Sequence, residues 1–245
     1  MMGHVAASMI AVAVAVMSAC GSSGPTHQGS DPIGASGAQH RTTPAPHIAW
    51  RDNAFGTDAL PVVARAAEVA IVAVREIDGE RGFPNLKLEV RDRTDKTIQT
   101  ITILNSNEYE TLAPGGAAST TLQQRIDAAN VELARLHDLH DLVAMKPLEI
   151  QAPTDNTFPH LAIGDGVDVD WSSDHVHVFR HNSDRQVVTV DGKAWLAPVR
   201  PSCDNPAFLR AAFHAPELAV VVVQLAYRGS DSCGVPSDQF HVVAW

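Results

Sequence analysis

The most constraining feature of the sequence is an uninterrupted run of apolar residues in its last thirty positions, Leu218-Ala219-Val220-Val221-Val222-Val223. Successive side chains of a strand point to opposite faces, so a strand made only of apolar residues is apolar on both faces. Such a strand is typical of the interior of a fold, where both faces are covered. The run therefore predicts a central strand.

Alternation of apolar and charged residues predicts a hairpin earlier in the chain. Residues 86 to 91 alternate between aliphatic and charged side chains, and after Thr94-Asp95 the chain returns through Ile101 and Ile103. With a two-residue turn at Thr94-Asp95, Leu88 faces Ile101 and Leu86 faces Ile103. The predicted hairpin has one apolar face and one polar face.

Further strand signals lie on both sides of this hairpin. The stretch from Glu68 to Ile77 is apolar and rich in β-branched residues, and turn residues follow it. After residue 148, segments 167–171 and 175–179 flank Ser172-Ser173, and segments 186–190 and 194–199 flank Asp191-Gly192. Asp-Gly between two such segments is typical of a hairpin. These signals predict antiparallel pairing of neighbouring strands.

One segment has the periodicity of a helix. Apolar or histidine side chains recur at a spacing of four and three residues, which places them on one stripe of a helix over about 120–145: Leu122, Ile126, Ala129, Leu133, Leu136, His140 and Val143. Thr120 with Gln123, or Thr121 with Gln124, provides a capping box, and Lys146-Pro147 is expected to end the helix. The sequence thus predicts an α+β, mainly β fold, with antiparallel meander or hairpin sheets and one long helix packed on a sheet.

The N-terminal region has a different character. Val5 to Val16 is apolar apart from Ser8, which is shorter than the roughly 20 residues that span a bilayer, and Met17-Ser18-Ala19-Cys20 follows. This pattern resembles a bacterial lipoprotein signal. The resemblance implies a signal peptide at 1–19 and a Cys20 that carries acyl chains such as palmitate and anchors the protein to a membrane.

The resemblance also implies a location and a domain organisation. Residues 21–46 are mostly small or polar and predict a flexible tether, which leaves 47–245 as one globular, mainly β domain. The implied location is the cell envelope. Because Gly21 follows Cys20, the resemblance favours an outer-membrane or periplasm-facing protein if the organism has an outer membrane. In such an oxidising compartment, Cys203 and Cys233 predict a disulfide.

Charge restricts the binding partners. The chain has 18 basic and 28 acidic residues, a formal net charge of −10, and no basic run. Nucleic acid and anionic headgroups are therefore poor partners, whereas an envelope protein is compatible with this surface.

Acidic and histidine side chains around Ser172-Ser173 form a candidate metal site. If that dipeptide is a two-residue turn, Asp170 lies opposite His175 and Asp168 opposite His177, all on one face, and His181 extends the set. Two imidazoles and two carboxylates can bind Zn or another divalent transition metal. The other interpretation is a solvated outer face of a sheet.

A second pair of histidines and the C-terminal residues add little to the functional interpretation. His137 and His140 could share a metal, but their place beside the helix stripe favours structural histidines. The sequence has no P-loop, GxSxG or HExxH motif. The last 45 or so residues resemble the C-terminal ends of uncharacterised bacterial exported proteins, which implies no activity.

The sequence therefore favours a non-enzymatic, lipid-anchored module that binds a partner or belongs to the envelope, without a cofactor. The alternative is a divalent-metal-binding protein or metal-dependent enzyme that uses Asp168, Asp170, His175 and His177.

Overall fold

The computed structural model describes residues 44–51, 54–78, 82–153, 158–181, 185–196, 206–215, 217–228 and 237–245. All of them belong to one compact unit, Thr42–Trp245. Cys20, Cys203 and Cys233 lie outside the described residues, so the predicted lipidation and disulfide stay predictions.

The first sheet contains the predicted hairpin. Its strands are antiparallel and follow the order β6-β5-β4-β3-β7. They are β3 (Val62–Ala64), β4 (Val69–Asp78), β5 (Phe83–Asp92), β6 (Thr97–Leu104) and β7 (Leu142–Ala144). The predicted pairing of Leu88 with Ile101 is confirmed. Leu86 pairs with Leu104 rather than Ile103, because the register shifts by one residue between Leu86 and Lys87.

A helix and a hairpin cover one face of this sheet. The hairpin is β1 (His47–Arg51) with β2 (Ala54–Asp58), and the helix is α2 (Thr120–His140). The short helices η1 (Ser106–Glu108), α1 (Tyr109–Leu112) and η2 (Pro114–Gly116) lead into α2. Asn130 joins helix and hairpin, since its side chain accepts from Ile48 N and donates to Ile48 O, both at 2.9 Å.

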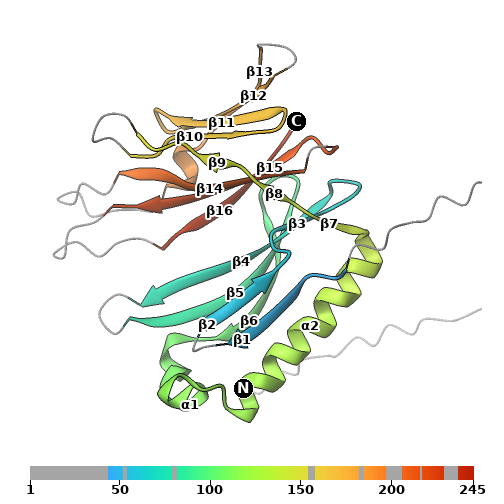
Figure 1. The fold of residues 1–245 in the computed structure, drawn as a ribbon, viewed down its shortest axis with the longest axis vertical. Coiled ribbons are helices and arrows are strands. Elements are labelled where there is room, and N and C mark those ends of the chain that lie inside the picture. The colour runs from blue at the N-terminus through green and yellow to red at the C-terminus, as the bar shows by residue number, and fades with distance from the viewer. Residues whose placement is uncertain are drawn as a thin grey trace, which may run out of the picture. The chain divides into compact units, whose positions relative to one another are not determined.

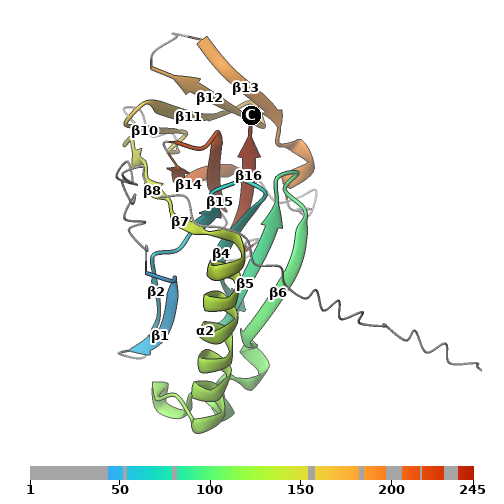
Figure 2. The same cartoon turned by 90° about the vertical axis from the view of Figure 1, so that its right-hand side faces the viewer.

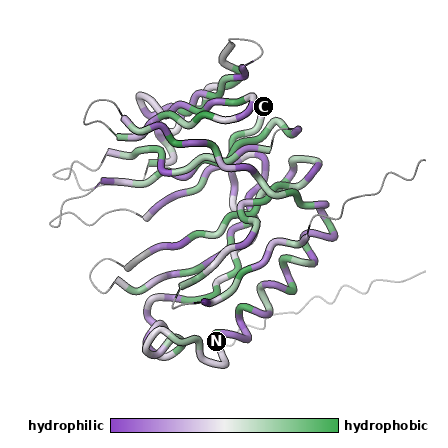
Figure 3. Tube along the Cα trace, in the orientation of Figure 1, coloured by the Kyte–Doolittle hydropathy of each residue, from purple (hydrophilic) through white to green (hydrophobic). Residues whose placement is uncertain are grey.

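The predicted stripe of α2 is confirmed over five positions, but both ends of the helix differ from the prediction. Leu122, Ile126, Ala129, Leu133 and Leu136 are buried, and Figure 3 shows hydrophobic and hydrophilic segments alternating along the helix. Ser119, not a threonine, is the N-cap and accepts from Leu122 N at 3.2 Å. The helix ends at His140 rather than at 145, because Asp141 adopts a left-handed conformation and the next three residues pair with β3 as β7.

Two further antiparallel sheets follow (Figure 1). The second sheet has the order β16-β15-β14-β8, from β8 (Lys146–Pro147), β14 (Ala207–Ala215), β15 (Val220–Tyr227) and β16 (Gln239–Ala244). The third has the order β13-β12-β11-β10-β9, from β9 (Glu149–Ile150), β10 (Leu161–Gly164), β11 (Val167–Ser172), β12 (His175–Arg180) and β13 (Arg185–Asp191). One turn of helix, η3 (Lys193–Trp195), follows β13, so the hairpin predicted across Asp191-Gly192 is wrong.

The sheets and the helix form successive layers (Figures 1 and 2). Three hydrophobic clusters lie between these layers. The first joins α2 and β1–β2 to the first sheet, the second joins the first sheet to the second, and the third joins the second sheet to the third. In β15, Val220 and Val222 contribute to the cluster with the first sheet, and Val221 and Val223 to the cluster with the third. The predicted central strand is confirmed, since these four valines are 0–1% exposed. The predicted fold class, α+β and mainly β with antiparallel sheets and a long helix on a sheet, is also confirmed.

Candidate functional site

The turn between β5 and β6 carries a side chain that connects the first sheet to the second. Asp92 Oδ1 shapes the turn by accepting from Thr94 N at 2.8 Å and from Lys96 N at 3.1 Å. Asp95 follows in the left-handed region, with φ of 67°, which aspartate tolerates. Its carboxylate accepts from His241 Nδ1 at 2.6 Å and from Val242 N at 2.7 Å. Asp95 therefore binds the free edge of β16.

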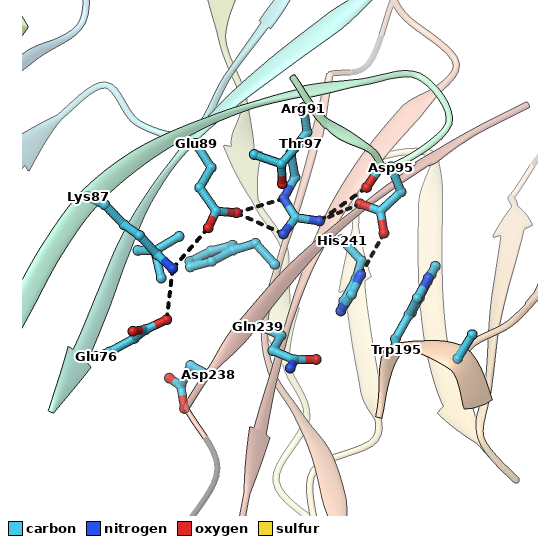
Figure 4. A pocket seen from close by; sticks show the side chains of 13 residues that line it. Glu76, Lys87, Glu89, Arg91, Asp95, Thr97, Trp195, Asp238, Gln239 and His241 are labelled. Carbon is cyan, nitrogen blue, oxygen red and sulfur yellow. Dashed lines mark hydrogen bonds and ion pairs between the residues drawn. The ribbon is translucent and has the colours of Figure 1, made fainter. Parts of the chain in front are cut away.

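Paired charges on β4, on β5 and in the following turn form a row that ends at Asp95 (Figure 4). The row consists of Glu76, Lys87, Glu89, Arg91 and Asp95. Arg91 donates to Glu89 Oε2 at 2.8 Å and to Asp95 Oδ1 at 2.9 Å, and Lys87 Nζ lies 3.0 Å from Glu76 Oε1 and 3.1 Å from Glu89 Oε1. The side chains of Glu89, Arg91 and Asp95 are only 10%, 14% and 12% exposed. The polar side chains that β5 contributes to the predicted hairpin are therefore turned inward, whereas Thr100 and Thr102 of β6 are exposed.

The pairing changes two pKa values in the row. Burial by itself would raise the pKa of Glu89, but the hydrogen bonds and charges of Arg91 and Lys87 outweigh it and lower that pKa. Burial by itself would lower the pKa of Lys87, but its contacts with Glu76 and Glu89 raise it. Both groups are therefore held in their charged forms at neutral pH.

His241 lies at the end of the row, with one ring nitrogen bound and the other unpartnered. Because a carboxylate only accepts hydrogen bonds, the contact with Asp95 places the proton on Nδ1. The side chain is 8% exposed, and Nε2 is buried with no hydrogen-bond partner among the described residues. The indole of Trp195 stacks on the imidazole with 4.2 Å between ring centroids and 6° between planes. Nε2 carries a free lone pair whenever the ring holds only the Nδ1 proton, and none of the described residues donates to it.

Trp195 is the last residue of η3, whose N-cap is Gly192. Gly192 N donates to Asp174 O at 2.8 Å, and Trp195 N donates to Gly192 O at 2.9 Å, which closes the turn. A Cβ at Gly192 would lie 2.5 Å from Trp171 Cζ3, closer than side chains tolerate. The absence of a side chain at Gly192 therefore allows the start of η3 to pack directly against the ring of Trp171.

The row, His241 and Trp195 line a cavity of about 420 Å3, a size suited to a small molecule. Three carboxylates of the row, on Glu76, Glu89 and Asp95, share the two cations Lys87 and Arg91. A fourth carboxylate of the lining, on Asp238, is bound at 2.8 Å by Arg210 and by Gln224. These three carboxylates and two cations leave one negative charge in the row, beside the contact between Asp95 and His241. The cavity is therefore suited to a polar ligand with a positively charged donor.

The structure separates the residues of the predicted metal site into individual pairs. The turn lies at Ser173-Asp174, with φ of 52° and 61°, rather than at Ser172-Ser173. The predicted register is therefore wrong: His177 lies opposite Asp170 and Phe179 lies opposite Asp168.

Of these side chains, Asp168 contacts a member of the predicted set, His181, and the others contact residues outside it. Asp168 accepts from His181 at 2.8 Å, and Asp170 from His160 at 2.8 Å. His175 contacts Ser173 O at 2.7 Å, and His177 contacts Thr189 Oγ1 at 3.0 Å. Across the part of the chain that the structure describes, no group of three or more His, Cys, Asp or Glu side chains is placed to hold a metal. The metal hypothesis stays a prediction.

The two histidines of α2 do not share a contact. His140 Nδ1 lies 3.0 Å from Glu68 Oε1, whereas His137 Nδ1 is buried and has no partner in the described ranges. No helix within those ranges is long and apolar enough to span a membrane.

Sequence reasoning did not identify Asp95, His241 or Trp195 as functional residues. The alternation of charges along β5 was visible, but alternation alone does not tell whether the polar face meets solvent or another sheet. His241 is 146 residues from Asp95, so no local spacing connects them.

No protein-family model, curated protein or solved structure matches this chain.

Proposed function

We propose that this chain is an exported, lipid-anchored binding protein that takes up a small, amine-bearing polar ligand in the cavity beside His241. One observation carries the proposal: a buried imidazole is oriented by Asp95 and Trp195, while its Nε2 has no partner among the described residues. A buried polar atom without a partner is costly. Because Nε2 is buried, a ligand N–H donor satisfies it once the lining side chains move aside to admit the ligand. The neighbouring carboxylate surplus favours a cation.

The ligand class sets the roles of the lining side chains. Nε2 of His241 accepts from the ligand amine, and the carboxylate row compensates its charge. Glu76 is the best-placed row member, because its side chain is 27% exposed while Glu89 is 10% exposed. The indole of Trp195 fixes the imidazole plane and provides an aromatic edge for the ligand.

A titration with matched probes tests the ligand class. The full chain carrying Cys20→Ser is titrated calorimetrically with putrescine and, separately, with succinate, which has the same four-carbon length and opposite charge. We expect binding of putrescine only, weakened about three- to tenfold by Glu76→Gln. Glu149→Gln, an exposed glutamate on β9, is the matched control and should leave the affinity unchanged. Equal binding of the two probes, or no effect of Glu76→Gln, would contradict the proposal.

The membrane anchor has a separate test. The pattern that ends at Cys20 supports attachment to the cell envelope, where an outer-membrane or periplasm-facing position follows from Gly21 if an outer membrane is present. Cys20→Ser should abolish incorporation of radiolabelled palmitate and release the protein from membranes. Continued labelling of the variant would show that the acyl chain is elsewhere.

A further inference from the structure

The free edge of β4 is unpaired over most of the strand. β5 pairs with β4 along the whole length from Val69 to Asp78, but on the other side β3 pairs only with Ala70 and Ile71. In the described residues, no backbone hydrogen bond reaches this second edge beyond Ile71. Unpaired N–H and C=O groups of an edge strand are a template for an added strand.

A groove of about 820 Å3 runs beside this edge and differs from the cavity at His241. Ala73 and Arg75 of β4 line it on one side, and Phe213 of β14 and Phe240 of β16 line it on the other. It borders the cavity, because Glu76, Asp238 and Phe240 line both. The groove therefore combines unpaired backbone groups of β4 with apolar side chains.

The two arginines that line the groove differ in whether a described carboxylate compensates their charge. Arg210 donates to Asp238 Oδ2 at 2.8 Å, which compensates its charge. Arg75 has no hydrogen-bond or ion-pair partner within the described ranges. A guanidinium presents planar donors suited to a carboxylate. Arg75 therefore gives the groove an unused binding group for an acidic side chain.

We propose that this groove binds an extended segment of a partner protein, which adds to β4 as an antiparallel or parallel strand. Residues of β4 alternate in direction: Ala73 and Arg75 share one face, whereas Val74 and Glu76 share the face toward Phe240. The added strand then places acidic side chains beside Arg75 and apolar side chains beside Phe213 and Phe240. Backbone pairing supplies affinity, and the alternation supplies specificity.

The experiment uses a decapeptide of alternating valine and glutamate with the full chain carrying Cys20→Ser. We expect binding by fluorescence anisotropy and slower hydrogen exchange of β4 amides beyond Ile71. Arg75→Gln should weaken binding about three- to fivefold through loss of one charge pair in a partly solvated groove. Arg51→Gln is the matched control, since Arg51 is 69% exposed and lies on β1. The control should bind the peptide as the parent chain does.

A second peptide separates strand addition from docking of side chains alone. Its alternate backbone nitrogens are methylated, so it keeps the side chains but cannot pair along one edge. Strand addition predicts that methylation on the pairing edge abolishes binding. Equal affinity of the methylated and unmethylated peptides would overturn the proposal, and so would protection from hydrogen exchange that is confined to strands other than β4. If the chain self-associates and its β4 amides are already protected before the peptide is added, the occupant is a second copy of the chain. That result would also overturn the proposal.

Discussion

Asp95 accepts hydrogen bonds from side chains and backbone of two different sheets. Its donors are Arg91 on β5, His241 on β16 and the backbone of Val242. The sequence predicts Asp95 as a turn residue, and the structure places it in a turn. Its partners could not be predicted, because the stacking of two sheets brings them together and no local pattern encodes that stacking.

Replacement of Asp95 by asparagine tests this role. The asparagine amide is neutral and has one acceptor oxygen where the carboxylate has two. Arg91 and His241 therefore lose charge-assisted hydrogen bonds in a buried setting. We expect Asp95→Asn to lower the free energy of unfolding by about 2 to 3 kcal/mol. Urea denaturation measures this loss, with Asp138→Asn, on the exposed face of α2, as the control. A loss no greater than that of the control would show that the link is unimportant for stability.

Elements that depend on local patterns were predicted better than those that depend on distant pairing. The five buried positions of α2 follow from a repeat in the sequence. The end of α2 does not follow from that repeat, because Leu142 to Ala144 pair with β3, eighty residues earlier in the chain. The turn at Ser173-Asp174 was displaced by one residue for a similar reason: the pairing of β11 with β12 continues to Ser172 and His175.

An ion pair joins α2 to η1 and gives a prediction for acid stability. Arg125 donates to both carboxylate oxygens of Glu108 at 2.9 Å and lowers the pKa of Glu108 to about 2. Because the folded-state pKa lies below the unfolded value of 4.5, this stabilisation is present above about pH 4.5 and is lost as pH falls toward 2. Urea denaturation from pH 6 to 3 should show a shallower loss of stability in Glu108→Gln than in the parent. Identical slopes would contradict the assignment.

At the scale of the whole molecule, the second sheet is the interior layer. The apolar run in β15 predicted a strand buried on both faces, but not which layers would cover it. The first sheet covers one face and the third sheet covers the other. Glu89 of the first sheet is buried in ion pairs with Lys87 and Arg91, and hydrophobic periodicity alone does not predict such a position.

Adjacent residues of β15 provide a test of this layering. Val221 and Val222 face different clusters and are both 0% exposed. Each substitution to alanine should therefore lower the free energy of unfolding by about 1 to 3 kcal/mol. In β12, by contrast, Val176→Ala should be destabilising and His177→Ala should have little effect, because only Val176 is buried. A neutral effect at either Val221 or Val222 in urea denaturation would contradict a strand covered on both faces.

The most direct test of the account is the protonation and hydrogen bonding of His241 Nε2, followed by 15N NMR during a putrescine titration at pH 7. The proposed site predicts a neutral ring with the proton on Nδ1, and a change in the Nε2 resonance as it accepts from the ligand, while Nδ1 stays bound to Asp95. An imidazolium with both nitrogens protonated, or an Nε2 resonance unchanged at saturating putrescine, would contradict the account.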